Sequence, residues 1–142
     1  MAQNKDTDIA VVGIGSLFPG AKTTREFWRN ILNKVQVLQE IPRHRWDWRI
    51  YFDEDRDAPD RIYSKWGGFI PDIPFDPLDY GIPPNTLKSI DPGQLMALEV
   101  ARQTLEDAGA FEKGFDKENT SVFIGSTMGM AELGQRLTAR VE

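Results

Sequence analysis

The hydrophobic pattern of the chain predicts two buried strands. Residues 9–14 (IAVVGI) form a continuous apolar, β-branched run, which is typical of a strand that is buried on both faces. Residues 120–125 (TSVFIG) repeat this pattern. Strands of this kind lie at the centre of parallel sheets that helices cover on both sides, so the pattern favours an α/β fold.

Two stretches between these runs have the caps and the spacing of helices. Thr23 and Glu26 have the spacing of a capping box, and the apolar residues after them form one face that we expect to pack on the sheet: Phe27, Trp28, Ile31, Leu32 and Val35. Asp91 followed by Pro92 predicts the start of another helix, which Gly109 ends. Its apolar side is predicted to contain Leu95, Leu98, Ala101, Leu105 and Ala108. A further helix is predicted from Met128 onward.

Residues 36–90 show no sustained period and contain most of the prolines and aromatic residues. We expect long loops and short turns that aromatic side chains pin to a core. A structureless stretch of this length is unusual inside a small domain. Because two strands do not make a stable sheet, the sequence predicts that the sheet is incomplete in this chain.

The composition limits the chemistry that the chain can perform. Its 142 residues contain no cysteine and one histidine, and the formal net charge is −5. Disulfides, thiolate metal sites and cysteine nucleophiles are therefore excluded for these residues. The acidic balance argues against binding to nucleic acid. No apolar run reaches the ~20 residues of a membrane span, and the polar start lacks the core of a signal peptide, so we predict a cytoplasmic protein.

Gly13 and Gly15 follow the first predicted strand, as in a dinucleotide-binding turn. That motif needs a third glycine where Phe18 stands, and Pro19 follows it. A glycine turn that ends the strand is the better interpretation. Ser16 also lacks the flanking glycines of a nucleophile elbow.

Two charged stretches have alternative functional interpretations. Asp53, Asp55 and Asp57 alternate as in a calcium loop, but that loop's glycine and terminal glutamate are missing. Residues 43–49 (RHRWDWR) interleave bases and aromatics, as single-strand binders do. We favour tryptophans buried as anchors, arginines that donate to loop carbonyls, and a solvated His44.

The ordered segments of the chain resemble a ketosynthase (β-ketoacyl synthase) domain from about residue 8 to the end. The resemblance rests on residues 9–21 (IAVVGIGSLFPGA), 41–46 (IPRHRW), 65–70 (KWGGFI), 75–84 (FDPLDYGIPP), 90–109 (IDPGQLMALEVARQTLEDAG) and 122–129 (VFIGSTMG). Residues 1–7 are a polar lead-in, and residues 8–142 resemble the N-terminal portion of that domain. The phrase YGIPPN at residues 80–85 is similar to the branch found in polyunsaturated-fatty-acid, enediyne and glycolipid-type synthases.

The resemblance implies the N-terminal part of a thiolase-like fold, with α-β-α-β-α layers in the complete domain, which is normally a homodimer. It also implies decarboxylative Claisen condensation of acyl and malonyl thioesters, with phosphopantetheine-linked acyl carrier protein as the substrate carrier and partner. The cysteine and the two histidines of that reaction belong to motifs that these 142 residues lack, so no catalytic, cofactor-binding or metal-binding residue is assigned. The resemblance places Met128 against the acyl pocket, and a core methionine is the alternative. A second interpretation of the whole chain is a non-catalytic ketosynthase-like interaction or scaffold module.

Overall fold

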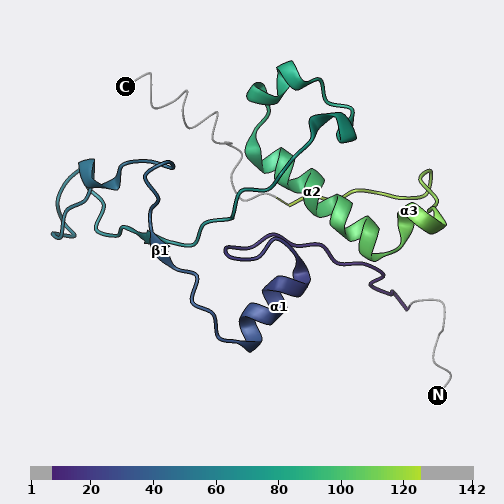
Figure 1. The fold of residues 1–142 in the computed structure, drawn as a ribbon, viewed down its shortest axis with the longest axis horizontal. Coiled ribbons are helices and arrows are strands. Elements are labelled where there is room, and N and C mark those ends of the chain that lie inside the picture. The colour runs from purple at the N-terminus through teal and green to yellow at the C-terminus, as the bar shows by residue number, and fades with distance from the viewer. Residues whose placement is uncertain (1–7, 126–142) are drawn as a thin grey trace. The chain divides into compact units, whose positions relative to one another are not determined.

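The computed structural model of the chain describes residues 8–125 and contains two compact units (Figure 1). Of the described residues, the first comprises 8–16 and 74–125, and the second is Leu17–Ile73. We refer to them as the helical unit and the loop unit, respectively.

The helical unit is built around α2 (Pro92–Asp107), which follows η3 (Pro77–Tyr80) and η4 (Pro84–Ser89) and precedes α3 (Ala110–Lys113). The side chain of Asp91 accepts a hydrogen bond from the Gly93 N–H at 2.7 Å, and Pro92 occupies the first helical turn. Gly109 follows the helix with φ of 68°, a left-handed conformation that favours glycine. Both predicted ends of this helix are confirmed.

The predicted apolar side of α2 is only partly correct. Leu98 and Ala101 are exposed, whereas the buried residue of the helix is Glu99. Tyr80 contacts α2 at Glu99. The segment of Gly13 and Gly15 contacts α2 on the side of Val100 and Thr104. The described residues of this unit form no sheet.

The loop unit contains α1 (Thr24–Leu32), β1 (Gln39–Glu40), η2 (Trp48–Ile50) and β2 (Trp66–Gly67). The helix start at Thr23 is confirmed, because Thr23 Oγ1 accepts from the Glu26 N–H at 3.2 Å. The reciprocal bond of a capping box is shifted by one residue, to the residue before the cap. The Glu26 carboxylate accepts in turn from the Lys22 N–H at 2.7 Å. β1 and β2 are antiparallel, with Gln39 opposite Gly67. The expected packing of the α1 apolar face is wrong, since Trp28 is 59% and Leu32 is 63% exposed. Val35 is not part of this face, because the helix ends at Leu32 and Lys34 has a φ of 53°.

The two predicted buried strands do not form. Residues 9–14 and 120–125 have no strand assignment, and Ile9 and Phe123 are 96% and 92% exposed. The only sheet within residues 8–125 is the β1–β2 pair. An extended apolar segment becomes a buried strand only when neighbouring strands satisfy its backbone groups and helices cover its faces. Here both are lacking, so the expected incompleteness of the sheet is confirmed.

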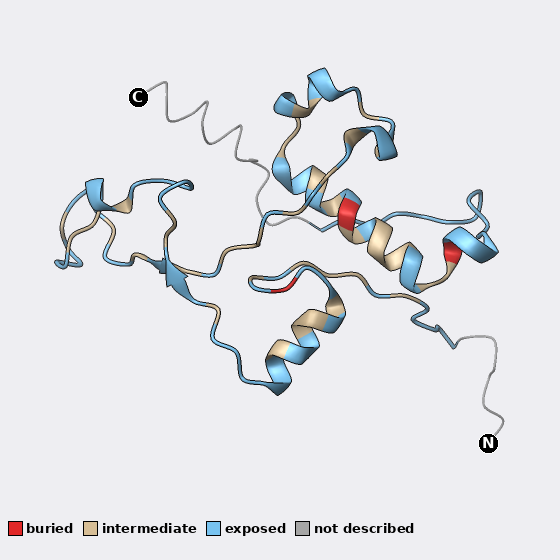
Figure 2. Ribbon diagram, viewed as in Figure 1, coloured by how far each residue is buried: buried red, intermediate tan, exposed pale blue. Residues whose placement is uncertain are grey.

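The predicted aromatic-pinned core is also absent from the part of the chain that the structure describes. The buried residues there are Ala21, Glu99 and Ala110 (Figure 2). The aromatic rings instead pair locally, as in Trp48 against Phe52 with centroids 5.4 Å apart and Phe75 against Tyr80 at 4.6 Å. Between residues 8 and 125, no helix combines the length and apolar character required to cross a membrane.

Candidate functional site

A buried carboxylate on α2 is the centre of a cluster of four hydrogen bonds. Glu99 is 8% exposed. Each of its two carboxylate oxygens accepts two hydrogen bonds. Oε2 accepts from Tyr80 Oη and from Arg102 Nε, each at 2.9 Å. Oε1 accepts from Arg102 Nη2 at 2.7 Å and from Gln103 Nε2 at 3.0 Å. We call these four residues the Glu99 cluster.

The hydrogen bonds of the Glu99 cluster favour an ionised Glu99 and a neutral Tyr80. The hydrogen bonds from Arg102 lower the pKa of Glu99 to about 2, against the opposing effect of burial, and Gln103 and Tyr80 add to the lowering. The pKa of Tyr80 is raised, chiefly by burial and then by its hydrogen bond to the Glu99 carboxylate. The hydrogen bond from Tyr80 joins η3 to α2. Because both carboxylate oxygens already accept two hydrogen bonds, Glu99 is not placed to take a proton from a substrate.

Sequence reasoning missed this cluster, although part of its signal was visible. Glu99 lies three residues before Arg102 and four before Gln103, which is the spacing of side chains that meet on one helix face. Nothing local connects Tyr80 to this face, because the contact spans 19 positions. The aromatic pair of Tyr80 with Phe75 then holds the preceding loop against the same cluster.

A second contact of the helical unit places the N-terminal segment directly against α2. A Cβ on Gly13 would lie 2.9 Å from the Ala108 Cβ, and one on Gly15 would lie 2.6 Å from Thr104 Oγ1. Neither glycine has a positive φ. The predicted glycine turn is wrong at these two positions, because the turn that follows lies at Pro19–Gly20. Gly13 and Gly15 instead remove side-chain volume where backbone and helix approach each other.

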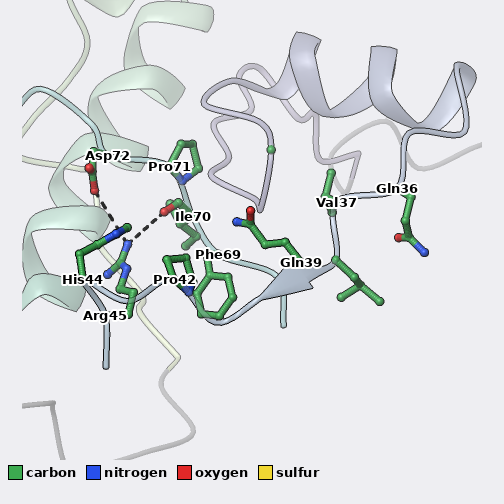
Figure 3. A pocket seen from close by; sticks show the side chains of 12 residues that line it. Gln36, Val37, Gln39, Pro42, His44, Arg45, Phe69, Ile70, Pro71 and Asp72 are labelled. Atoms are coloured by element: carbon green, nitrogen blue, oxygen red, sulfur yellow. Dashed lines mark hydrogen bonds and ion pairs between the residues drawn. The ribbon is translucent and has the colours of Figure 1, made fainter. Parts of the chain in front are cut away.

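The loop unit contains a cavity of about 400 Å³, which Figure 3 shows from close by. Its walls come from Gly20, from the segments before and after β1, and from the segment after β2. They consist of Gly20, Gln36, Val37, Leu38, Gln39, Pro42, His44, Arg45, Phe69, Ile70, Pro71 and Asp72. This volume falls in the range of small-molecule sites, and the mixture of apolar walls and a few charged groups is typical of them.

Arg45 is the charged group that organises this cavity. Its Nη2 donates to the Ile70 carbonyl at 3.2 Å and lies 3.9 Å from Asp72 Oδ1, as the dashed lines in Figure 3 mark. The Asp72 side chain is 96% exposed, so this ion pair contributes little. The predicted arginine contact to a loop carbonyl is confirmed here, and His44 is exposed at the rim as expected. The prediction for Trp46 is wrong, since it is 39% exposed.

The remaining site predictions have separate outcomes. Asp53 and Asp55 each accept a backbone N–H from two residues further on, at 3.0 Å, so they organise their own loop. Across residues 8–125, no set of three or more His, Asp or Glu side chains is arranged to hold a metal ion. Met128 lies outside the described residues.

Comparison with known protein families shows which family the chain belongs to. The family described as "Beta-ketoacyl synthase, N-terminal domain" matches residues 6–141. The chain belongs to this ketosynthase family. The resemblance drawn from the ordered segments is thereby confirmed.

Relatives and solved structures agree with this family. Polyketide synthase PksM of Bacillus subtilis strain 168 is 42% identical over 103 residues, which cover 72% of this chain and 2% of PksM. The oxazolomycin ketosynthase domain OzmH KS7 of Streptomyces albus JA3453 is 34% identical, with a TM-score of 0.65 over 68% of this chain and 17% of that one. The ketosynthase from module 6 of the bacillaene synthase of Bacillus subtilis 168 is 35% identical, with a TM-score of 0.61 over 70% of this chain and 16% of that one.

These similarities confirm the predicted fold class. The chain has the N-terminal part of a thiolase-like ketosynthase fold, with a small sheet that is incomplete in these residues. It spans only a small fraction of the length of the curated relatives that it matches.

Proposed function

We propose that the chain is the N-terminal portion of a β-ketoacyl-[acyl carrier protein] synthase, a condensing acyltransferase of polyketide or fatty acid biosynthesis. The family match across residues 6–141 carries this proposal, and relatives named as polyketide synthases support it. Residues 1–7 are proposed as a lead-in and residues 8–142 as the ketosynthase portion.

The proposed reaction has two stages. The thiol of an enzyme cysteine first attacks an acyl thioester, and the carrier thiol leaves as the acyl group moves to the cysteine. A malonyl group on the phosphopantetheine arm of acyl carrier protein then loses carbon dioxide, and the electron pair of the broken C–C bond becomes a carbanion. This carbanion attacks the acyl carbonyl and expels the cysteine thiolate, so the β-ketoacyl product stays on the carrier.

Residues 1–142 supply scaffold to this reaction and no nucleophile, because they contain no cysteine. Acyl carrier protein is the proposed partner, and the complete ketosynthase is proposed to be a homodimer. We propose that Met128, in the run GSTMG at residues 125–129, lines the acyl pocket. A flexible thioether suits a wall that adapts to different chains.

The test compares the isolated chain with a chimera in which it replaces the matching stretch of OzmH KS7. Both are incubated with a hexanoyl thioester, and their intact masses are measured before malonyl-acyl carrier protein is added. The chimera is expected to gain one hexanoyl group and then to form a β-ketoacyl carrier, while the isolated chain gains no mass. Acylation of the isolated chain, or a folded chimera that retains its cysteine but accepts no acyl group, would contradict the proposal.

The role of Met128 is tested in the same chimera. Met128→Trp is expected to favour short over long acyl thioesters, since a larger wall shortens the pocket. Met130→Trp is the matched control, two residues further along the chain. An unchanged ratio of kcat/KM for hexanoyl and dodecanoyl substrates in Met128→Trp would refute the assignment.

A further inference from the structure

The cavity of the loop unit has an apolar floor and a polar rim. The half-buried residues of its wall are all apolar: Val37, Pro42, Phe69, Ile70 and Pro71. The charged and amide side chains of the wall are exposed: Gln36, Gln39, His44, Arg45 and Asp72. A ligand that matches this division has an apolar body and one polar head group, and the cavity volume is sufficient for a small molecule.

The walls of this cavity are joined to each other by the contacts of β1 with β2. Gln39 lies opposite Gly67, and the Ile41 N–H donates to the Lys65 carbonyl at 2.9 Å. Lys65 Nζ lies 2.9 Å from Glu40 Oε1. The segments before and after β1 are therefore tied to the segment after β2 without a ligand. A cavity that is formed in advance spares a ligand the cost of ordering its walls.

Arg45 supplies the positive charge of the rim. Its Nη2 contacts the Ile70 carbonyl and Asp72, whereas its Nε and Nη1 donate to no group within residues 8–125 (Figure 3). The guanidinium therefore has donors left for a ligand, and its planar fork matches the geometry of a carboxylate. Asp72 opposes an anion at this place, but only weakly, because its side chain is 96% exposed and lies 3.9 Å away.

The charge of the rim selects a singly charged head group. With His44 neutral, the rim contains one cation, Arg45, and one carboxylate, Asp72. A dianionic phosphate ester would meet one arginine and a stronger repulsion from Asp72. We propose that the loop-unit cavity binds a small aliphatic monocarboxylate, with its carboxylate on Arg45 and its chain against Phe69 and Ile70. This inference rests on the cavity and not on the proposed condensation.

A comparison of head groups tests the ligand class. The 142-residue chain is titrated at neutral pH with hexanoate, hexanol and hexyl phosphate, and amide chemical shifts are followed by NMR. Hexanoate is expected to cause saturable changes within residues 36–45 and 69–72, and hexanol is expected to bind at least about tenfold more weakly. Hexanol that binds as tightly as hexanoate, tighter binding of hexyl phosphate, or shift changes centred outside these residues would each overturn the proposal.

Substitution of Arg45 tests its role in the site. Arg45→Met is expected to weaken hexanoate binding at least about tenfold and to leave hexanol binding unchanged. Arg43→Met is the matched control, because Arg43 is exposed and does not line the cavity. Slow exchange of the Ile41 amide, which donates to the Lys65 carbonyl, reports that the walls are intact. Unchanged hexanoate affinity in Arg45→Met with intact walls would overturn the proposal.

A second variant keeps the test decisive if Arg45→Met loses the walls. Asp72→Lys changes an exposed side chain at the rim and replaces a negative charge by a positive one. It is expected to tighten hexanoate binding about fivefold and to leave hexanol binding unchanged. Equal effects on the two ligands, or no effect on hexanoate, would overturn the assignment of the carboxylate to this rim.

Discussion

Replacement of Arg102 by methionine is expected to raise the pKa of Glu99. The pKa of Glu99 lies at about 2 instead of 4.5, chiefly because Arg102 donates to both carboxylate oxygens. This lowering corresponds to about 3 kcal/mol in favour of the carboxylate form. The stabilisation is fully present above the unfolded pKa of 4.5 and is lost as the pH falls through the folded pKa of about 2.

The expected magnitude follows from the two lost hydrogen bonds. Charge-assisted hydrogen bonds contribute about 1.5–3 kcal/mol each, and screening reduces this because the Arg102 side chain is 41% exposed. We therefore expect the pKa of Glu99 to rise by roughly one to two pH units in Arg102→Met. The assay is a pH titration of the Glu99 side-chain carboxyl carbon by NMR in the isolated chain.

Tyr80 provides the readout that separates this effect from unfolding. The positive charge of Arg102 lowers the pKa of Tyr80, so its removal in a folded cluster should raise that pKa further. Unfolding would instead return the Tyr80 pKa to 10.0. Glu106→Gln is the control, because Glu106 contacts Arg102 but not Glu99. A Glu99 pKa that stays at about 2 in a helical Arg102→Met variant would refute the reasoning.

Three further predictions follow from the local structure. The Ile14 N–H donates to Asp107 Oδ2 at 2.9 Å. Gly15→Ala should displace the N-terminal segment from α2 and increase exchange of the Ile14 amide at least about tenfold, since overpacking costs about 1–3 kcal/mol. Gly125→Ala is the control and should have no effect, because a Cβ there meets nothing within 4 Å. Equal exchange of the Ile14 amide in the two variants would contradict the close contact of Gly15 with α2. Thr23→Ala should reduce the helical circular dichroism of α1, since loss of a cap costs about 1 kcal/mol; an unchanged signal in a peptide spanning the helix would argue against the cap. The isolated chain should melt gradually in calorimetry, because its described part buries so few side chains; a sharp transition would favour the interaction-module interpretation.

Local signals in the sequence determined where α1 and α2 begin, where α2 ends, and the family. The end of α1 was not determined, because the apolar spacing continues to Val35 whereas the helix ends at Leu32. Thr23 with Glu26, and Asp91 with Pro92, are caps whose partners lie within a few residues, so the pattern alone contains the whole interaction. The ordered ketosynthase segments are likewise a property of the sequence, and the family match confirms them. The subfamily suggested by YGIPPN and the cytoplasmic location stay predictions.

Only the tertiary structure decided which faces are buried. The run at residues 9–14 has the composition of a buried strand, yet burial depends on neighbouring strands, and the sequence of one strand does not contain its neighbours. The contacts of Tyr80 with Glu99 and of Ile14 with Asp107 join residues far apart in the chain, so no periodicity reveals them. The sequence alone thus determined the caps, the absence of a cysteine nucleophile and the ketosynthase family. The structure decided that α2 is held through a buried carboxylate and two glycines, because those contacts depend on how distant segments meet.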